Sequence, residues 1–143
     1  MSKKCSKCKS FLEIEEFWKD SSRPDGFRAI CRSCDKQKGD ERRQRLALFL
    51  NRVRELGCKC CNEKEICCID LHHVGSEKKF DINLICKNKI AFQKVIDELS
   101  KCTTVCSNCH RKIHKGILSE PEVLDKDLEG LVEEYRKIYP RTK

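Results

Sequence analysis

Four Cys-x-x-Cys pairs constrain the fold of this 143-residue chain more than any other feature. The chain has 13 Cys, and its hydrophobic residues, Cys included, make up only 38% of it, so little apolar surface is left for a core. Small domains with thin cores depend on disulfides or metal ions. The odd Cys count and the polar, basic opening MSKKCSKCKS argue against secretion and a complete disulfide set. The pairs therefore predict metal sites in an intracellular, cytoplasmic protein.

The first two pairs predict a small zinc ribbon. Four thiolates complete a tetrahedral Zn²⁺ site, and the expected ligands of this first structural zinc are Cys5, Cys8, Cys31 and Cys34. Residues 23–26, Arg-Pro-Asp-Gly, predict a β-turn between the pairs. Four aromatic residues are expected to form a miniature core: Phe11, Phe17, Trp18 and Phe27. The alternative of unconnected buried Cys fails because this segment has too few apolar residues to fold without a metal.

Residues 32–56 predict a helix that stops at Gly57. Apolar residues recur every three or four positions, as on one face of a helix, at Leu46, Phe49, Leu50, Val53 and Leu56. Basic residues, interleaved with acidic ones, occupy the other faces, among them Arg42, Arg43 and Arg45. Two interpretations stay open for them: an ordinary solvated helix face, or a basic surface that follows a phosphate backbone.

A second α+β unit is expected from Cys58 to about Gly116. A strand at 66–74, a helix at 90–99 and a short strand at 103–105 are expected between two further Cys pairs, and a helix follows the second pair. The pairs lie at opposite ends of this order and predict a second structural zinc, held by Cys58, Cys61, Cys106 and Cys109. The other Cys are expected to be small buried hydrophobes, although Cys60 could replace a neighbouring ligand: Cys60, Cys67, Cys68, Cys86 and Cys102.

All four His lie in two short segments, IDLHHV (69–74) and CSNCHRKIH (106–114). His110 and His114 are one helical turn apart, so both can bind one ion. His72 and His73 are adjacent on a strand and point to opposite faces, so one can complete a metal site while the other acts as a base. Asp70 could orient an imidazole or bind the ion directly. The alternative is a closed structural zinc site that uses all four His.

The charge of the chain suits a polyanionic partner, since 31 Lys+Arg stand against 23 Asp+Glu. No apolar run approaches the length of a membrane span, so no membrane association is expected.

Residues 119–143 predict an acidic amphipathic helix that packs on the body of the chain or on a second subunit. The apolar stripe of this helix is Leu124, Leu128, Leu131 and Tyr135. Two interpretations stay open: the stripe forms the interface of a homodimer, or it covers the core of a monomer.

Five motifs in this order together resemble the HNH endonucleases common in bacteriophages: Cys58-x-x-Cys61, IDLHHV, Lys78–Phe80, Glu98–Cys102 and CSNCHRKIH. The leading CSKC…DGF…CRSC segment resembles the zinc module that often precedes such domains. The resemblance covers roughly residues 5–118 and implies a small zinc-stapled α+β protein with a ββα-metal (His-Me finger) domain and flanking helices. The implied segments are a zinc ribbon (1–39), a basic linker helix (40–57), an HNH nuclease domain (58–118) and an acidic C-terminal helix (119–143).

By residue, the resemblance implies that His73 is the general base and that His72, His110 and His114 bind a catalytic divalent ion. Histidine ligands are compatible with Mg²⁺, Mn²⁺, Ni²⁺ and Zn²⁺. The implied reaction is hydrolysis of phosphodiester bonds in double-stranded DNA, in a bacterium or a phage-infected host. The candidate DNA contacts are Arg42, Arg43, Arg45, Lys78, Lys79, Arg111 and Lys112.

One position departs from the HNH pattern. The family's middle Asn, which braces the loop that carries the base, falls at about Lys101. The intact ligand positions and base favour the enzyme, and the alternative function is a non-catalytic zinc-finger nucleic-acid-binding protein with a relic HNH site. A third is a structural protein of a phage or host complex, with the acidic tail as its docking helix.

Overall fold

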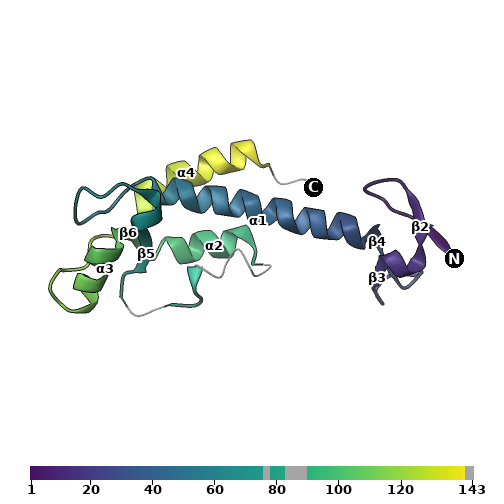
Figure 1. Ribbon diagram of the computed structural model, residues 1–143, viewed down its shortest axis with the longest axis horizontal. Helices are drawn as coiled ribbons and strands as arrows, with labels where there is room; N and C mark the ends of the chain where they lie inside the picture. Colours follow the sequence, from purple (N-terminus) through teal and green to yellow (C-terminus); the bar gives the residue numbers. More distant parts are fainter. Residues whose placement is uncertain (76–77, 83–89, 141–143) are drawn as a thin grey trace. The chain divides into compact units, whose positions relative to one another are not determined.

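The computed structural model describes residues 1–75, 78–82 and 90–140 and is a small α+β protein (Figure 1). It divides into two compact units, Met1–Arg45 and Leu46–Lys143. Within the described residues, the first unit contains two short antiparallel strand pairs and the second contains one, and each unit contains one cluster of four Cys. None of the helices in the described ranges is long and apolar enough to cross a membrane.

The first unit is built from two antiparallel strand pairs. β1 (Ser2–Lys4) pairs with β2 (Phe11–Glu13), and β3 (Phe17–Lys19) pairs with β4 (Phe27–Cys31), with the short 3-10 helix η1 (Ile14–Glu16) between β2 and β3.

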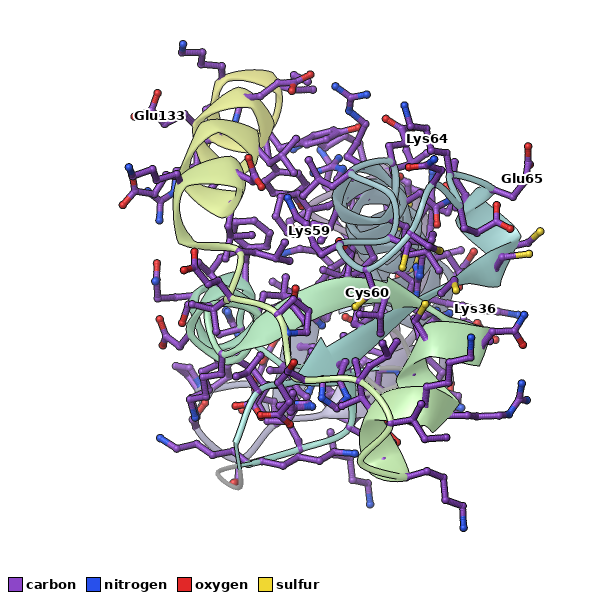
Figure 2. All side chains as sticks on the ribbon, turned by 90° about the vertical axis from the view of Figure 1, so that its left-hand side faces the viewer. Lys36, Lys59, Cys60, Lys64, Glu65 and Glu133 are labelled. Carbon is purple, nitrogen blue, oxygen red and sulfur yellow. The ribbon has the colours of Figure 1, made fainter. Side chains whose placement is uncertain are left out.

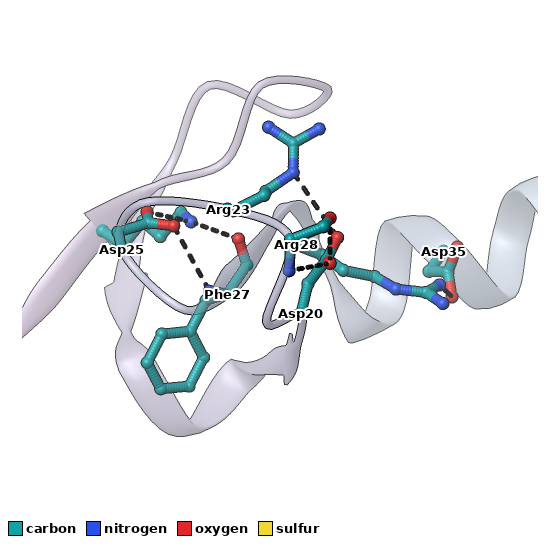
Figure 3. Close-up of polar contacts among 8 residues, drawn as sticks. Asp20, Arg23, Asp25, Phe27, Arg28 and Asp35 are labelled. Carbon is teal, nitrogen blue, oxygen red and sulfur yellow. Dashed lines mark hydrogen bonds and ion pairs between the residues drawn. The ribbon is translucent and has the colours of Figure 1, made fainter.

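The predicted turn at residues 23–26 is confirmed. The Gly26 N–H donates to the Arg23 carbonyl at 3.0 Å, and Gly26 has a φ of +73°, a conformation that glycine adopts without a steric penalty. Asp25 accepts the Phe27 N–H at 3.2 Å and the Lys3 ammonium (Figure 3). These contacts fix the turn between β3 and β4.

The centre of the first unit is occupied by cysteines rather than by the predicted aromatic cluster. Phe17 is fully buried, together with Cys5, Cys31 and Cys34, and Phe27 packs against them. Phe11 and Trp18, however, are 70% and 48% exposed, so that part of the prediction is wrong. The strands are only three to five residues long and have one inner face, which the thiols fill.

The predicted long helix is confirmed as α1 (Arg32–Arg54), which begins in the first unit and ends in the second. Gly57, with a φ of +75°, follows it. The predicted apolar positions are inside, since Leu46, Phe49, Leu50 and Val53 are all buried and Leu56 is partly buried. Several of its basic residues pair with acids of the same helix, as Arg43 does with Asp40.

The second unit follows the predicted order of elements. It contains η2 (Ile66–Cys68), β5 (Ile69–His73), α2 (Phe92–Leu99), β6 (Cys102–Cys106), α3 (Ser107–His114) and α4 (Asp125–Ile138). β5 and β6 are antiparallel, with His72 opposite Thr103 and His73 opposite Cys102. The predicted strand at 66–74 is shorter than expected because residues 66–68 form a 3-10 turn.

The core of the second unit lies where α1, α2 and α4 pack together (Figure 1). Phe49 of α1 meets the rings of Phe92 and Tyr135 edge-on, with both centroid distances 5.1 Å. The predicted stripe of the C-terminal helix belongs to this core, since Leu124 and Leu128 are buried and Leu131 and Tyr135 pack against them. The stripe therefore covers the chain's own core. A homodimer through this helix stays a prediction.

The Cys outside the four pairs have different environments. Cys102 is buried, as predicted, but Cys67 is exposed and Cys68 only half-buried, because both precede β5 in a surface turn. Cys60 is half-buried beside the β5–β6 pair (Figure 2), where it packs against the apolar cluster around Cys106 and Cys109. Cys86 lies outside the described residues.

Candidate metal centres and histidine site

The first Cys₄ cluster gathers the four predicted ligands. The sulfur atoms of Cys5, Cys8, Cys31 and Cys34 all lie within 4.8 Å of one another, so they can hold one structural Zn²⁺. Burial raises the pKa of Cys5, but the backbone N–H groups of Cys31, Cys8 and Lys7 lower it to about 6. The Cys31 thiol and burial raise the pKa of Cys34 to about 12. A bound cation would favour the thiolate form of these residues, because zinc binds cysteine as the thiolate.

The second Cys₄ cluster joins the two ends of the second unit. The sulfur atoms of Cys58, Cys61, Cys106 and Cys109 also lie within 4.8 Å of one another. Cys106 ends β6 and caps α3, where its sulfur accepts the Cys109 N–H at 3.4 Å. Cys60 is not part of this group, so the predicted set stands. Burial raises the pKa of Cys58 while backbone N–H groups lower it, to a net value of about 7.

Three histidines form a separate cluster. His72 comes from β5, and His110 and His114 come from one face of α3, with potential ligand nitrogens within 4.8 Å of one another. Their ring centroids are 4.8 to 5.1 Å apart. Burial lowers the pKa of His72, although the hydrogen bond to Glu120 raises it. The neutral imidazole favoured by burial is the form that binds a metal.

Two of these imidazoles hydrogen-bond to carboxylates. Asp70 Oδ2 lies 3.1 Å from His110 Nδ1, and Glu120 Oε1 lies 3.1 Å from His72 Nε2. The sequence singled out Asp70 because it stands two residues before His72 on the same strand. It gave no reason to choose Glu120, which is one of many acids in the C-terminal segment.

His73 points away from the three-histidine cluster, as predicted from its place on the strand. Its Nε2 lies 2.9 Å from Oε1 of Glu98, a residue of α2 that is 1% exposed. Glu98 also accepts the Lys79 N–H at 2.8 Å and faces the Lys101 ammonium at 3.4 Å. Burial raises the pKa of Glu98, but these three donors outweigh burial and hold the pKa below its ordinary value. Glu98 is therefore an ionised, buried acceptor at neutral pH, and the sequence did not predict it.

A cavity of about 430 Å³ connects the two kinds of histidine. All four histidines line it, together with Leu71, Gly75, Lys78, Asp81 and Ile82. Lys78, a predicted nucleic-acid contact, brings a positive charge to this cavity and lies 3.7 Å from Asp81. Lys78 and Asp81 therefore bring opposite charges to the cavity that His73 shares with the histidine cluster.

The other predicted nucleic-acid contacts have different positions. Arg111 and Lys112 are exposed on α3, beside the cluster histidines. Lys79 is exposed, and its backbone binds Glu98. Arg42, Arg43 and Arg45 belong to the first unit, where Arg45 approaches Glu41 at 4.0 Å. DNA contact by these residues stays a prediction.

Comparison of the chain with protein-family models, with curated proteins and with solved structures finds no match. The resemblance to HNH endonucleases therefore stays a prediction from motifs, and support for a function comes from the geometry of the sites.

The Cys₄ clusters predict two zinc ions per chain. Cys31→Ser should reduce the zinc content from two ions to one, because it removes a ligand from the first cluster alone. The first unit should then unfold, since its centre is built from the ligand cysteines. Elemental analysis after dialysis against a weak chelator measures the zinc, and ¹⁵N–¹H NMR spectra show which unit loses its dispersed signals.

Cys67→Ser, which changes an exposed thiol outside both clusters, is the matched control and should keep both ions. Two tightly bound ions in Cys31→Ser would contradict the first site.

Proposed function

We propose that the second unit is a metal-dependent HNH endonuclease that hydrolyses phosphodiester bonds in DNA. The observation that carries this proposal is the shared cavity, in which a three-histidine cluster lies beside a fourth histidine bonded to a buried carboxylate. β5, β6 and α3 would be the two strands and the helix of a ββα-metal fold. The two zinc clusters would be structural, because four thiolates complete the coordination of zinc.

The donor set of the histidine cluster fits a divalent cation. His72, His110 and His114 would hold it through three imidazole nitrogens, a set that suits Zn²⁺ and Ni²⁺ better than Mn²⁺ and Mg²⁺, which prefer oxygen ligands. A cation held by these residues would supply stabilisation of the negative charge that develops in the transition state. Lys78, Arg111 and Lys112 would contact neighbouring phosphates.

His73 would act as the general base. Because an ionised carboxylate only accepts hydrogen bonds, His73 donates its Nε2–H to Glu98, and its Nδ1 is left to accept a proton. His73 would take a proton from a water molecule, whose oxygen attacks phosphorus in line while the bond from phosphorus to O3′ breaks. The departing O3′ would take a proton from solvent. The products are 5′-phosphate and 3′-hydroxyl ends, and Glu98 stabilises the imidazolium that forms.

Glu98 would also replace the family's middle Asn. In the resemblance, that Asn braces the loop that carries the base, and Lys101 stands in its place. Here the carboxylate of Glu98 binds His73, the Lys79 N–H and the Lys101 ammonium together. Glu98 would thus hold the base and the segment that follows its strand, so it is a positioning residue.

His73→Ala should abolish most cleavage, because it removes the base and leaves the metal ligands in place. Loss of a general base lowers the rate by about 100-fold to 10,000-fold. Conversion of supercoiled plasmid to nicked or linear DNA, by zinc-loaded protein with each of the four candidate cations, measures the rate. The same variant should keep two zinc ions and bind DNA as the parent protein does, so a folding defect is excluded directly. Full activity in His73→Ala would refute the assignment of the base.

If the parent protein binds DNA but cuts it with none of the four cations, the alternative of a non-catalytic zinc-finger protein is supported instead. Binding is measured by fluorescence anisotropy with labelled duplex DNA, at more than one salt concentration because phosphate contacts are salt-dependent.

Glu98→Ala should lower both stability and activity. It leaves three partly buried donors without their acceptor, which costs up to about 1–3 kcal/mol of folding free energy. Glu98→Gln keeps an acceptor oxygen and removes the charge, so it should fold better and still lower kcat more than it raises KM. Urea denaturation of the zinc-loaded protein measures stability. Asp97→Ala, which changes the exposed neighbouring acid on α2, is the matched control. Unchanged kcat in both Glu98 variants would contradict the positioning role.

A further inference from the structure

We propose that Glu120 is a positioning residue for the metal ligand His72, so that the metal centre extends into the segment between α3 and α4. This inference rests on the divalent-metal site proposed above, although it does not depend on nuclease chemistry. Glu120 stands after both strands and the helix that carry the histidines, in a part of the chain that the motifs do not reach.

The segment that carries Glu120 is anchored on both sides. Leu118 packs against the apolar cluster that contains Cys106 and Cys109. Leu124 is 1% exposed, and its N–H donates to the Cys102 carbonyl of β6 at 3.0 Å. Only a few residues separate these anchors, so the chain between them has little freedom to move Glu120 away from the strand pair.

Both carboxylate oxygens of Glu120 bind the end of β5. Oε1 lies 3.1 Å from His72 Nε2, and Oε2 accepts the Gly75 N–H at 3.2 Å. His72 itself is only 3% exposed. One side chain therefore connects the ligand imidazole to the backbone just after the strand that carries His72 and His73.

These contacts determine which nitrogen of each ring can bind an ion. Glu120 accepts the proton on His72 Nε2, and Asp70 accepts the proton on His110 Nδ1. The nitrogens left with a lone pair are His72 Nδ1 and His110 Nε2. A carboxylate on the outer nitrogen of a ligand histidine fixes the tautomer and the ring orientation and makes the ligand nitrogen more basic.

Glu120 is better placed to support His72 than to bind the ion itself. Among the described residues, the ligand atoms that gather within 4.8 Å at this site are those of His72, His110 and His114, and Glu120 is not among them. Its side chain is also 41% exposed, unlike the imidazole that it holds.

Cobalt titration of the zinc-loaded protein tests this inference. Co²⁺ bound to histidines absorbs visible light but shows no thiolate charge-transfer band. Appearance of that band would mean that Co²⁺ had replaced zinc in a Cys₄ site. Glu120→Ala should weaken Co²⁺ binding by about 10-fold to 100-fold, the usual effect of losing such a partner. Glu120→Gln keeps an acceptor oxygen and should lose less. Glu122→Ala, a nearby exposed acid, should bind like the parent protein, and His114→Ala should lose the site.

NMR of ¹⁵N-labelled imidazoles adds a readout that does not depend on the metal. His72 should be protonated at Nε2 in the parent protein and should become a mixture of tautomers in Glu120→Ala. Equal cobalt affinity and an unchanged tautomer in Glu120→Ala would refute this inference alone. If Glu120→Gln loses as much affinity as Glu120→Ala and changes the cobalt spectrum, Glu120 is a direct ligand and the positioning role is wrong. No cobalt binding by the parent protein would overturn the proposed function and this inference together.

Discussion

The second Cys₄ cluster is the constraint on which the arrangement of the second unit depends. Cys106 is the last residue of β6 and Cys109 lies in the first turn of α3, so one ion bound to both would fix the angle between strand and helix. His110 follows Cys109 directly, and the pairing of β5 with β6 places His72 opposite Thr103. The sulfur cluster thereby positions the three histidines without sharing a ligand with them.

Carboxylates from three different elements then orient the histidines. Asp70 of β5 binds His110, Glu98 of α2 binds His73, and Glu120 of the following segment binds His72. Glu98 is held by the packing of α2, whose Val95 and Leu99 lie in the core with α1 and α4. The core and the site are therefore coupled: a substitution that loosens α2 or the segment before α4 should disturb the histidines even though it changes none of them.

The sequence was most informative where the signal is local. Cys-x-x-Cys spacing, the i, i+4 spacing of His110 and His114, and alternation along β5 depend only on short-range backbone geometry, so the clusters and most elements could be predicted. Glu98 and Glu120 could not, because they lie 25 and 48 residues from their histidines and are two of 23 acids. The exposure of Trp18 did have a local signal, because it follows the buried Phe17 on β3 and adjacent residues of a strand point to opposite faces.

The two kinds of ligand set suit different tasks because they leave different charges. In a Cys₄ site, four thiolate charges exceed the two positive charges of zinc, so such a site repels phosphate and serves as a cross-link. Three neutral imidazoles leave the charge of a divalent cation uncompensated, which favours binding of an anionic phosphate. If Asp70 and Glu120 bound the ion directly, they would cancel that charge at its source. Placed on the outer nitrogens of His110 and His72, they would orient the ligands and leave more of the charge of a bound cation available to a phosphate.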